Sequence, residues 1–69
     1  MTVADVFVKW STATESNPVM IITFDKHYIF SNMRKVPEYV LRAKVLSFHE
    51  AAPFPYFGDK PVLVFKIDD

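Results

Sequence analysis

Hydrophobic residues make up 51% of this 69-residue chain, and the aromatic ones are seven phenylalanines, three tyrosines and one tryptophan. A domain of this size buries only about 60% of the surface that its unfolded chain exposes. Some apolar surface therefore has to stay exposed on an isolated copy. Such surface in a small protein typically marks an interface, often with a second copy of the same chain.

Length and composition predict one domain over residues 1–69, near the lower size limit for folding without cross-links. The absence of cysteine excludes disulfides and thiolate metal sites. The longest apolar runs, at 19–22 and 62–65, are far shorter than the ~20 residues that span a bilayer. The N-terminus also lacks the pattern of a signal peptide. We therefore expect a soluble, cytoplasmic protein that does not associate with membranes.

The first half of the chain predicts strands. Residues 3–10 alternate between an apolar and a mixed face with a period of two, which is typical of a strand. The polar cluster at 11–18 ends that strand. Residues 19–30 are rich in β-branched and aromatic side chains, with an interruption at Asp25-Lys26. A hairpin of 20–24 and 27–30 is slightly favoured there over one long, bent strand.

Residues 37–50 predict a helix. Pro37 suits a first helical position, and the carboxylate of Glu38 suits the positive end of a helix dipole. Pro53 would stop any such helix, because the residue before a proline avoids the α conformation. The alternative is a strand over residues 43–49.

The end of the chain predicts a loop and a last strand. Residues 52–61 contain three of the five prolines and the only glycine, so they form a stiff, turn-rich loop. Residues 61–67 form a strand that is well covered, because its apolar run does not alternate. The expected fold is α+β: a small antiparallel sheet of three or four strands packed by one helix, in the order β-β(-β)-α-β.

A helix over 37–50 would have more apolar surface than one sheet can cover. At about 100° per residue it would carry two apolar arcs, nearly opposite each other. The arc made by Leu41, Val45 and Phe48 is therefore the candidate self-association face. Alternatively, the second half of the segment is not helical, or residues 53–57 fold back over this arc.

The proline-flanked aromatic segment is the candidate partner-binding element. Pro53 and Pro55 fix an extended backbone around Phe54, so exposed rings there would lose little entropy on binding. Phe54, Tyr56 and Phe57 are the expected anchors. The alternative is that Phe54 and Phe57 fold inward as a lid on the sheet.

Charge is unevenly distributed although the net charge is zero. Residues 26–44 contain five cations and only one anion, Glu38. We expect Arg34, Lys35 and Arg42 to supply a charged rim that sets the register and the association rate of a protein partner.

The same basic segment supports an alternative function, the binding of single-stranded DNA or RNA. Aromatic rings on a sheet stack on bases while neighbouring cations bind phosphates. The residues concerned are Arg34, Lys35, Arg42 and Lys44 with Trp10, Tyr28 and Phe30. A neutral chain argues against strong phosphate affinity, so this alternative ranks second.

The sequence predicts no catalytic, metal or cofactor site. His27 and His49 lack the clustered spacing of metal ligands. A triad of Ser47, His49 and Asp25 lacks a nucleophile elbow and a glycine-rich oxyanion loop. We therefore expect a non-enzymatic protein-interaction module that self-associates or docks on a larger protein as an adaptor or inhibitor. Its small size and lack of cysteine are common among phage and bacterial accessory proteins, which is an analogy only.

Overall fold

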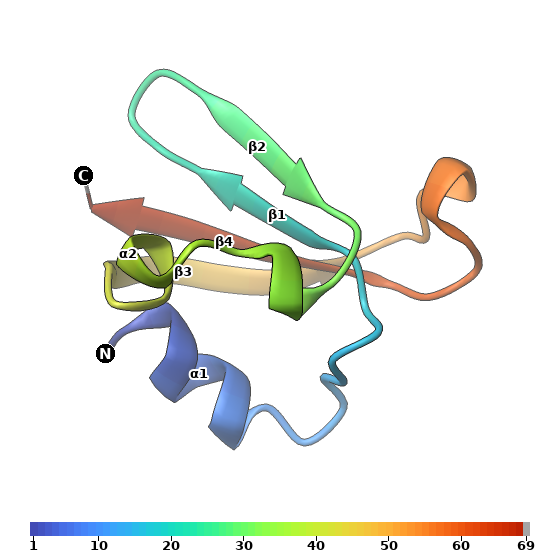
Figure 1. The fold of residues 1–69 in the computed structure, drawn as a ribbon, viewed down its shortest axis with the longest axis horizontal. Helices are drawn as coiled ribbons and strands as arrows, with labels where there is room; N and C mark the ends of the chain where they lie inside the picture. The colour runs from blue at the N-terminus through green and yellow to red at the C-terminus, as the bar shows by residue number, and fades with distance from the viewer. Residues whose placement is uncertain (69) are drawn as a thin grey trace.

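The computed structural model describes residues 1–68, except for the side chain of Phe57. Short helical segments pack on a single four-stranded sheet (Figure 1). The predicted α+β class is therefore confirmed. In chain order the elements are α1 (Val3–Lys9), β1 (Val19–Ile22), β2 (His27–Phe30), the 3-10 helix η1 (Met33–Lys35), α2 (Glu38–Leu41), β3 (Lys44–Ala51), the 3-10 helix η2 (Pro55–Phe57) and β4 (Val62–Asp68).

The sheet has the strand order β2-β1-β4-β3 and is mixed. β1 and β2 form the expected antiparallel hairpin around Asp25-Lys26, where the Thr23 N–H donates to the Lys26 carbonyl oxygen at 2.9 Å. β4 lies in the centre, parallel to β1 and antiparallel to β3. The prediction of a wholly antiparallel sheet is wrong for the β1–β4 pair, which is parallel, because β4 inserts between β1 and β3.

The hydrophobic core lies on one face of this sheet. Alternate residues of β1 and β4 point into it, and Phe65 in the central strand is completely buried. α1, η1 and α2 each contribute buried side chains to the same face, so all three helical segments cover it. The core residues are Val3, Val6, Val19, Ile21, Met33, Val36, Val40, Leu63, Phe65 and Ile67.

The predicted strand at residues 3–10 is wrong, because this segment forms α1. A capping box begins the helix: the Asp5 N–H donates to Thr2 Oγ1 at 3.2 Å, and the Thr2 N–H donates to Asp5 Oδ2 at 3.1 Å. Val3 and Val6, three residues apart, are the buried side chains. The helical period therefore decides which residues are buried, in spite of the β preference of valine.

The predicted helix at residues 37–50 is correct only in its first turn. Pro37 caps the start of α2 and is not its first residue, and the helix ends at Arg42. The alternative strand is confirmed: β3 pairs with β4 along its length, with one bulge between Val45 and Ser47. Pairing with a distant strand overrides the helix propensity of this segment, which local sequence cannot reveal.

Hydrogen bonds fix the two long loops to each other at one end of the sheet. The buried side chain of Asn17 donates to the Pro61 carbonyl oxygen at 2.9 Å and accepts from the Thr14 N–H at 2.9 Å. Lys60 Nζ donates to Ser16 Oγ. Gly58 ends η2 at φ 108° and ψ −158°, a conformation essentially restricted to glycine. As predicted, residues 52–61 form a turn-rich loop, which extends beyond the end of the sheet (Figure 1).

Candidate protein-interaction surface

β3 forms one edge of the sheet, and its outer backbone groups can be identified from the hydrogen bonds of β4. Successive residues of a strand direct their N–H and C=O groups to alternate sides. The Leu63 N–H donates to Pro18 at 2.9 Å, on the β1 side. The N–H and C=O groups of the next residue, Val64, therefore face β3, where Val64 lies opposite His49. His49 in turn directs its backbone groups toward β4. The two residues that flank His49 therefore direct their backbone groups away from the sheet.

Those two residues are Phe48 and Glu50. Among residues 1–68, no backbone group outside the sheet pairs with either of them. Nearer the start of the strand the edge is occupied, because the Val45 N–H donates to the Met1 carbonyl oxygen at 2.8 Å. Beyond its end, Pro53 has no N–H with which to continue a ladder. The open edge is therefore confined to residues 46–51.

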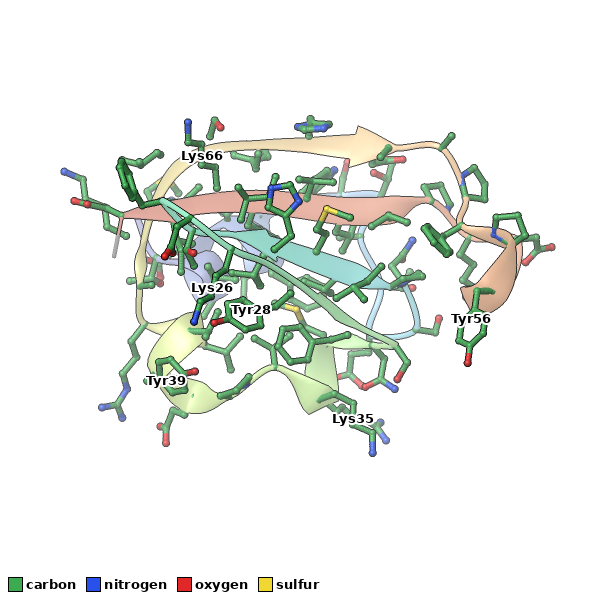
Figure 2. All side chains as sticks on the ribbon, turned by 90° about the horizontal axis from the view of Figure 1, so that it is seen from above. Lys26, Tyr28, Lys35, Tyr39, Tyr56 and Lys66 are labelled. Carbon is green, nitrogen blue, oxygen red and sulfur yellow. The ribbon has the colours of Figure 1, made fainter. Side chains whose placement is uncertain are left out.

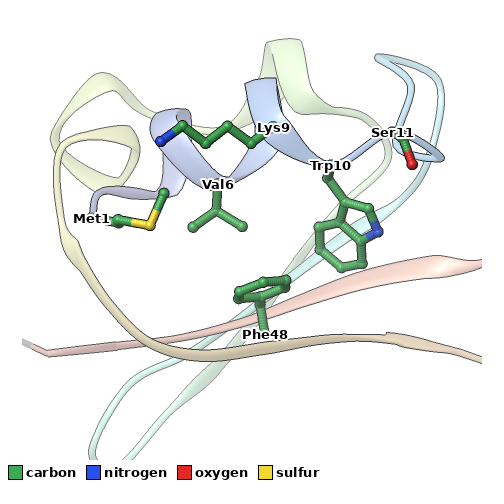
Figure 3. Close-up of a pocket in the computed structure, with 6 residues that line it drawn as sticks. All are labelled: Met1, Val6, Lys9, Trp10, Ser11 and Phe48. Atoms are coloured by element: carbon green, nitrogen blue, oxygen red, sulfur yellow. The ribbon is translucent and has the colours of Figure 1, made fainter.

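An apolar hollow lies between α1 and this edge strand. It has two lobes, of about 250 and 380 Å³, which share Met1, Val6 and Phe48. Figure 3 shows the Phe48 ring on β3 pointing toward Val6 and Trp10 on the α1 side. We call this the α1–β3 hollow; its apolar lining is Met1, Val6, Trp10, Val45, Leu46 and Phe48.

Aromatic packing holds the lining of the hollow in place. The Trp10 ring lies 5.1 Å from the Phe48 ring and 5.7 Å from the buried Phe65 ring, measured between centroids. Phe48 is nevertheless 50% exposed, and Leu46 beside it is 53% exposed. A ring that is both fixed and exposed loses little conformational entropy on binding, as is typical of an interface anchor.

Polar groups also lie at the hollow. Lys9 and Ser11 line it together with the apolar side chains. Near the other end of the strand, the Thr12 hydroxyl donates to Glu50 Oε2 at 2.8 Å. The pKa of Asp5 is lowered because its carboxylate accepts a hydrogen bond from the Thr2 backbone and also interacts with the Thr2 side chain. This carboxylate stays charged at neutral pH and stabilises the start of α1.

The predicted anchors lie on the loop beyond the end of the sheet. The Tyr56 side chain is 84% exposed, and Figure 2 shows it well away from the strands. Phe54 is also exposed. The side chain of Phe57, the third predicted anchor, lies outside the described part of the chain. The alternative was an inward lid made by Phe54 and Phe57; of these two, Phe54 remains 46% exposed.

The predicted charged rim is not brought together. Arg34 forms an ion pair with Glu15 at 2.9 Å, near the 11–18 loop. Arg42 pairs with Glu38 at 2.8 Å, just before β3 begins. Lys35 lies on η1, apart from the labelled Tyr56 (Figure 2). These three cations therefore do not surround the loop aromatics.

The predicted self-association face does not exist as a helical arc. Leu41 lies on α2 and packs half-buried against the core, whereas Val45 and Phe48 lie on β3. These two residues do meet again, as lining of the α1–β3 hollow. Met1, Val6 and Leu46 were missed as members of this surface. The Thr2–Asp5 capping pattern is the sequence signal that could have placed α1, and with it the hollow.

Two further hollows lie elsewhere in the described part of the molecule. One, of about 360 Å³, is lined by the Glu15–Arg34 ion pair with Ser16 and Asn32. The other, of about 270 Å³, lies between the sheet and α2 and combines mainly apolar and aromatic side chains with Thr23 and Asp68. Within residues 1–68, no three His, Cys, Asp or Glu side chains are grouped to hold a metal ion. No helix in that range is long and apolar enough to cross a membrane.

The candidate stacking aromatics are not displayed together on an exposed sheet face. Tyr28 and Phe30 lie opposite the core residues Ile21 and Val19, on the face that the helical segments cover. Trp10 follows α1 and packs on Phe48 and Phe65. Comparison of the chain with protein-family models, curated proteins and solved structures gives no match.

Proposed function

We propose that this chain is a non-enzymatic protein-interaction module that binds an extended segment of a partner along the open edge of β3. The observation that carries the proposal is the pair of outward-facing backbone positions, Phe48 and Glu50, directly beside the α1–β3 hollow. In strand addition, backbone hydrogen bonds supply affinity, and side-chain pockets beside the edge supply specificity. Both features occur together on this side of the molecule.

The exposed side chains around the hollow supply the hydrophobic contribution. Met1, Leu46 and Phe48 each leave half or more of their surface accessible. Covering the exposed part of each would contribute about 1 kcal/mol before the entropic cost of association. The exposed Phe54 and Tyr56 extend the apolar surface on the loop that follows β3. An adaptor or inhibitor of this size has sufficient surface for one such contact.

Nucleic-acid binding has less support. Arg34 and Arg42 already have carboxylate partners, and Tyr28 and Phe30 point toward the helical side of the sheet. We expect labelled single-stranded DNA and RNA to show no salt-dependent binding at micromolar protein concentrations. Such binding, if lost when Arg34 and Lys35 are replaced by alanine, would favour the alternative function.

A displayed library of extended peptides tests the proposed function. We expect the selected peptides to carry alternating apolar residues and to bind with micromolar affinity. Amide chemical shifts should change in residues 46–51 and in α1. Leu46→Lys should weaken binding by about tenfold, whereas Ile29→Lys on the opposite edge strand should not. Failure to select any peptide, or shifts that map elsewhere, would contradict the proposal.

A further inference from the structure

We infer that the partner segment is β3 of a second copy of this chain, paired antiparallel about a two-fold axis at His49. This inference rests on the proposed function, because it names the occupant of the same edge.

The backbone directions are compatible with this register. A two-fold axis perpendicular to a continuous sheet requires the residue on the axis to lie opposite itself. With His49 on the axis, Phe48 of one copy lies opposite Glu50 of the other. Both direct their N–H and C=O groups outward, so the two Phe48–Glu50 pairs would exchange four hydrogen bonds. The pairing fits within the open stretch of residues 46–51.

The same register brings the loop of one copy to the hollow of the other. Phe54 follows His49 by five residues, which corresponds to roughly 16 Å of extended chain. Antiparallel pairing directs it toward the start of β3 on the first copy. There the backbone of Met1 adjoins Val45, at one end of the α1–β3 hollow. The loop aromatics and the hollow would therefore meet twice, once on each side of the axis.

The charged groups at this surface already have neighbours within one copy. Lys44 lies opposite Asp68 of β4, and Glu50 Oε2 accepts from the Thr12 hydroxyl. The chain has zero net charge, so two copies experience no overall repulsion.

The exposed apolar area is sufficient for a stable pair. A large side chain presents about 150–250 Å² when fully accessible. At their exposed fractions, the five side chains at this surface would bury on the order of 600 Å² per copy, or about 1,200 Å² in total, the lower end of the range for stable complexes. The five are Met1, Leu46, Phe48, Phe54 and Tyr56.

A single introduced cysteine tests the register. The chain contains no cysteine, so His49→Cys provides one thiol per copy. Opposed residues at such a non-hydrogen-bonded position are about 4.5 Å apart between Cα atoms, within the range that a disulfide spans. His27→Cys is the matched control, because His27 is likewise exposed and lies on the other edge strand. Mild oxidation should cross-link His49→Cys at least about tenfold faster than His27→Cys.

Sedimentation equilibrium of the unmodified protein completes the experiment. We expect a species of twice 8.0 kDa at about 100 µM protein. A monomer at that concentration, or equal cross-linking rates for the two cysteine variants, would overturn the inference. A monomer that still binds library peptides at β3 would leave the proposed function intact, whereas a monomer that binds none would contradict both.

Discussion

The two edges of the sheet differ in length and in what lies beside them. β2 has four residues, and β3 has eight. By the same alternation, the N–H and C=O groups of Tyr28 and Phe30 face β1. The N–H and C=O groups of His27 and Ile29 therefore face outward on β2. The cavity on the β2 side lies between the sheet and α2, whereas the hollow beside β3 lies between α1 and the edge strand.

This comparison shows how one sheet can protect one edge and leave another available. A very short edge strand is a common protection against unwanted pairing. β3 has partial protection, since Met1 covers its start and a bulge interrupts it between Val45 and Ser47. Within its last six residues, Phe48 and Glu50 keep outward backbone groups next to the exposed Leu46 and Phe48 side chains. An open edge with an apolar hollow beside it is therefore the feature that indicates binding.

The largest expected effect concerns the packing beneath β3. Trp10→Ala removes the ring that contacts both Phe48 and Phe65 and should lower the free energy of unfolding by about 2–4 kcal/mol. Tyr28→Ala on the β2 side should lower it by only about 1 kcal/mol, because this side chain is substantially exposed. Urea denaturation of both variants measures the difference. Equal decreases in the free energy of unfolding would show that side-chain packing stabilises the two edge strands to the same extent.

The next effect concerns association. Phe48→Asp places a charge beside the hollow and should raise the dissociation constant of the dimer about 100-fold, or ~2.7 kcal/mol. The matched change Ile29→Asp on β2 should alter it less than threefold. Sedimentation measures both constants, and circular dichroism verifies that both variants are folded. A similar weakening by the two changes would remove the distinction between the edges.

A smaller effect comes from the cap of α1, which lies beneath β3 and not β2. Thr2→Ala removes the hydroxyl that accepts from the Asp5 N–H and should lower the free energy of unfolding by ~1 kcal/mol. Amide exchange should then quicken in α1 and at the start of β3 but not in the hairpin. Thr12→Ala, outside the helix, is the control. No change in α1 would mean that the capping box contributes nothing.

The smallest effect is the response of this cap to pH. The pKa of Asp5 is lowered in the folded protein, chiefly by the hydrogen bond from the Thr2 backbone. The carboxylate therefore contributes stability that is present above the unfolded pKa and is lost as pH falls through the folded one. Stability should decline between about pH 5 and pH 2, and less steeply in Asp5→Asn. Identical pH profiles for the two proteins would contradict this contribution.

Local patterns were sufficient for part of the fold. The β-rich segment with Asp25-Lys26 at its turn, the loop with three prolines and the apolar last strand were all predicted, because each depends on neighbouring residues. Residues 3–9 do not form the predicted strand. The Thr2–Asp5 capping box begins a helix there, which buries Val3 and Val6 at the helical spacing and leaves Val8 exposed. The segment that forms β3 had two interpretations, helix or strand, and pairing with β4 across the 52–61 loop decides for the strand.

The candidate surface was predictable in its composition but not in its geometry. The excess of apolar residues correctly indicated exposed side chains, and Val45 and Phe48 were named for an arc that does not form. The hollow brings together residues from the first ten positions and from β3. No local period connects these segments, so only the folded topology shows that Met1, Val6 and Trp10 lie beside Phe48.

Amide hydrogen exchange at the two edges tests the central claim most directly. At low protein concentration, the outward N–H groups of Phe48, Glu50 and Ile29 should all exchange rapidly. Raising the concentration should slow exchange at Phe48 and Glu50 by at least about tenfold and leave Ile29 unchanged. Exchange at Phe48 and Glu50 that stays fast at every concentration, or slowing confined to Ile29, would contradict the assignment of β3 as the contact strand.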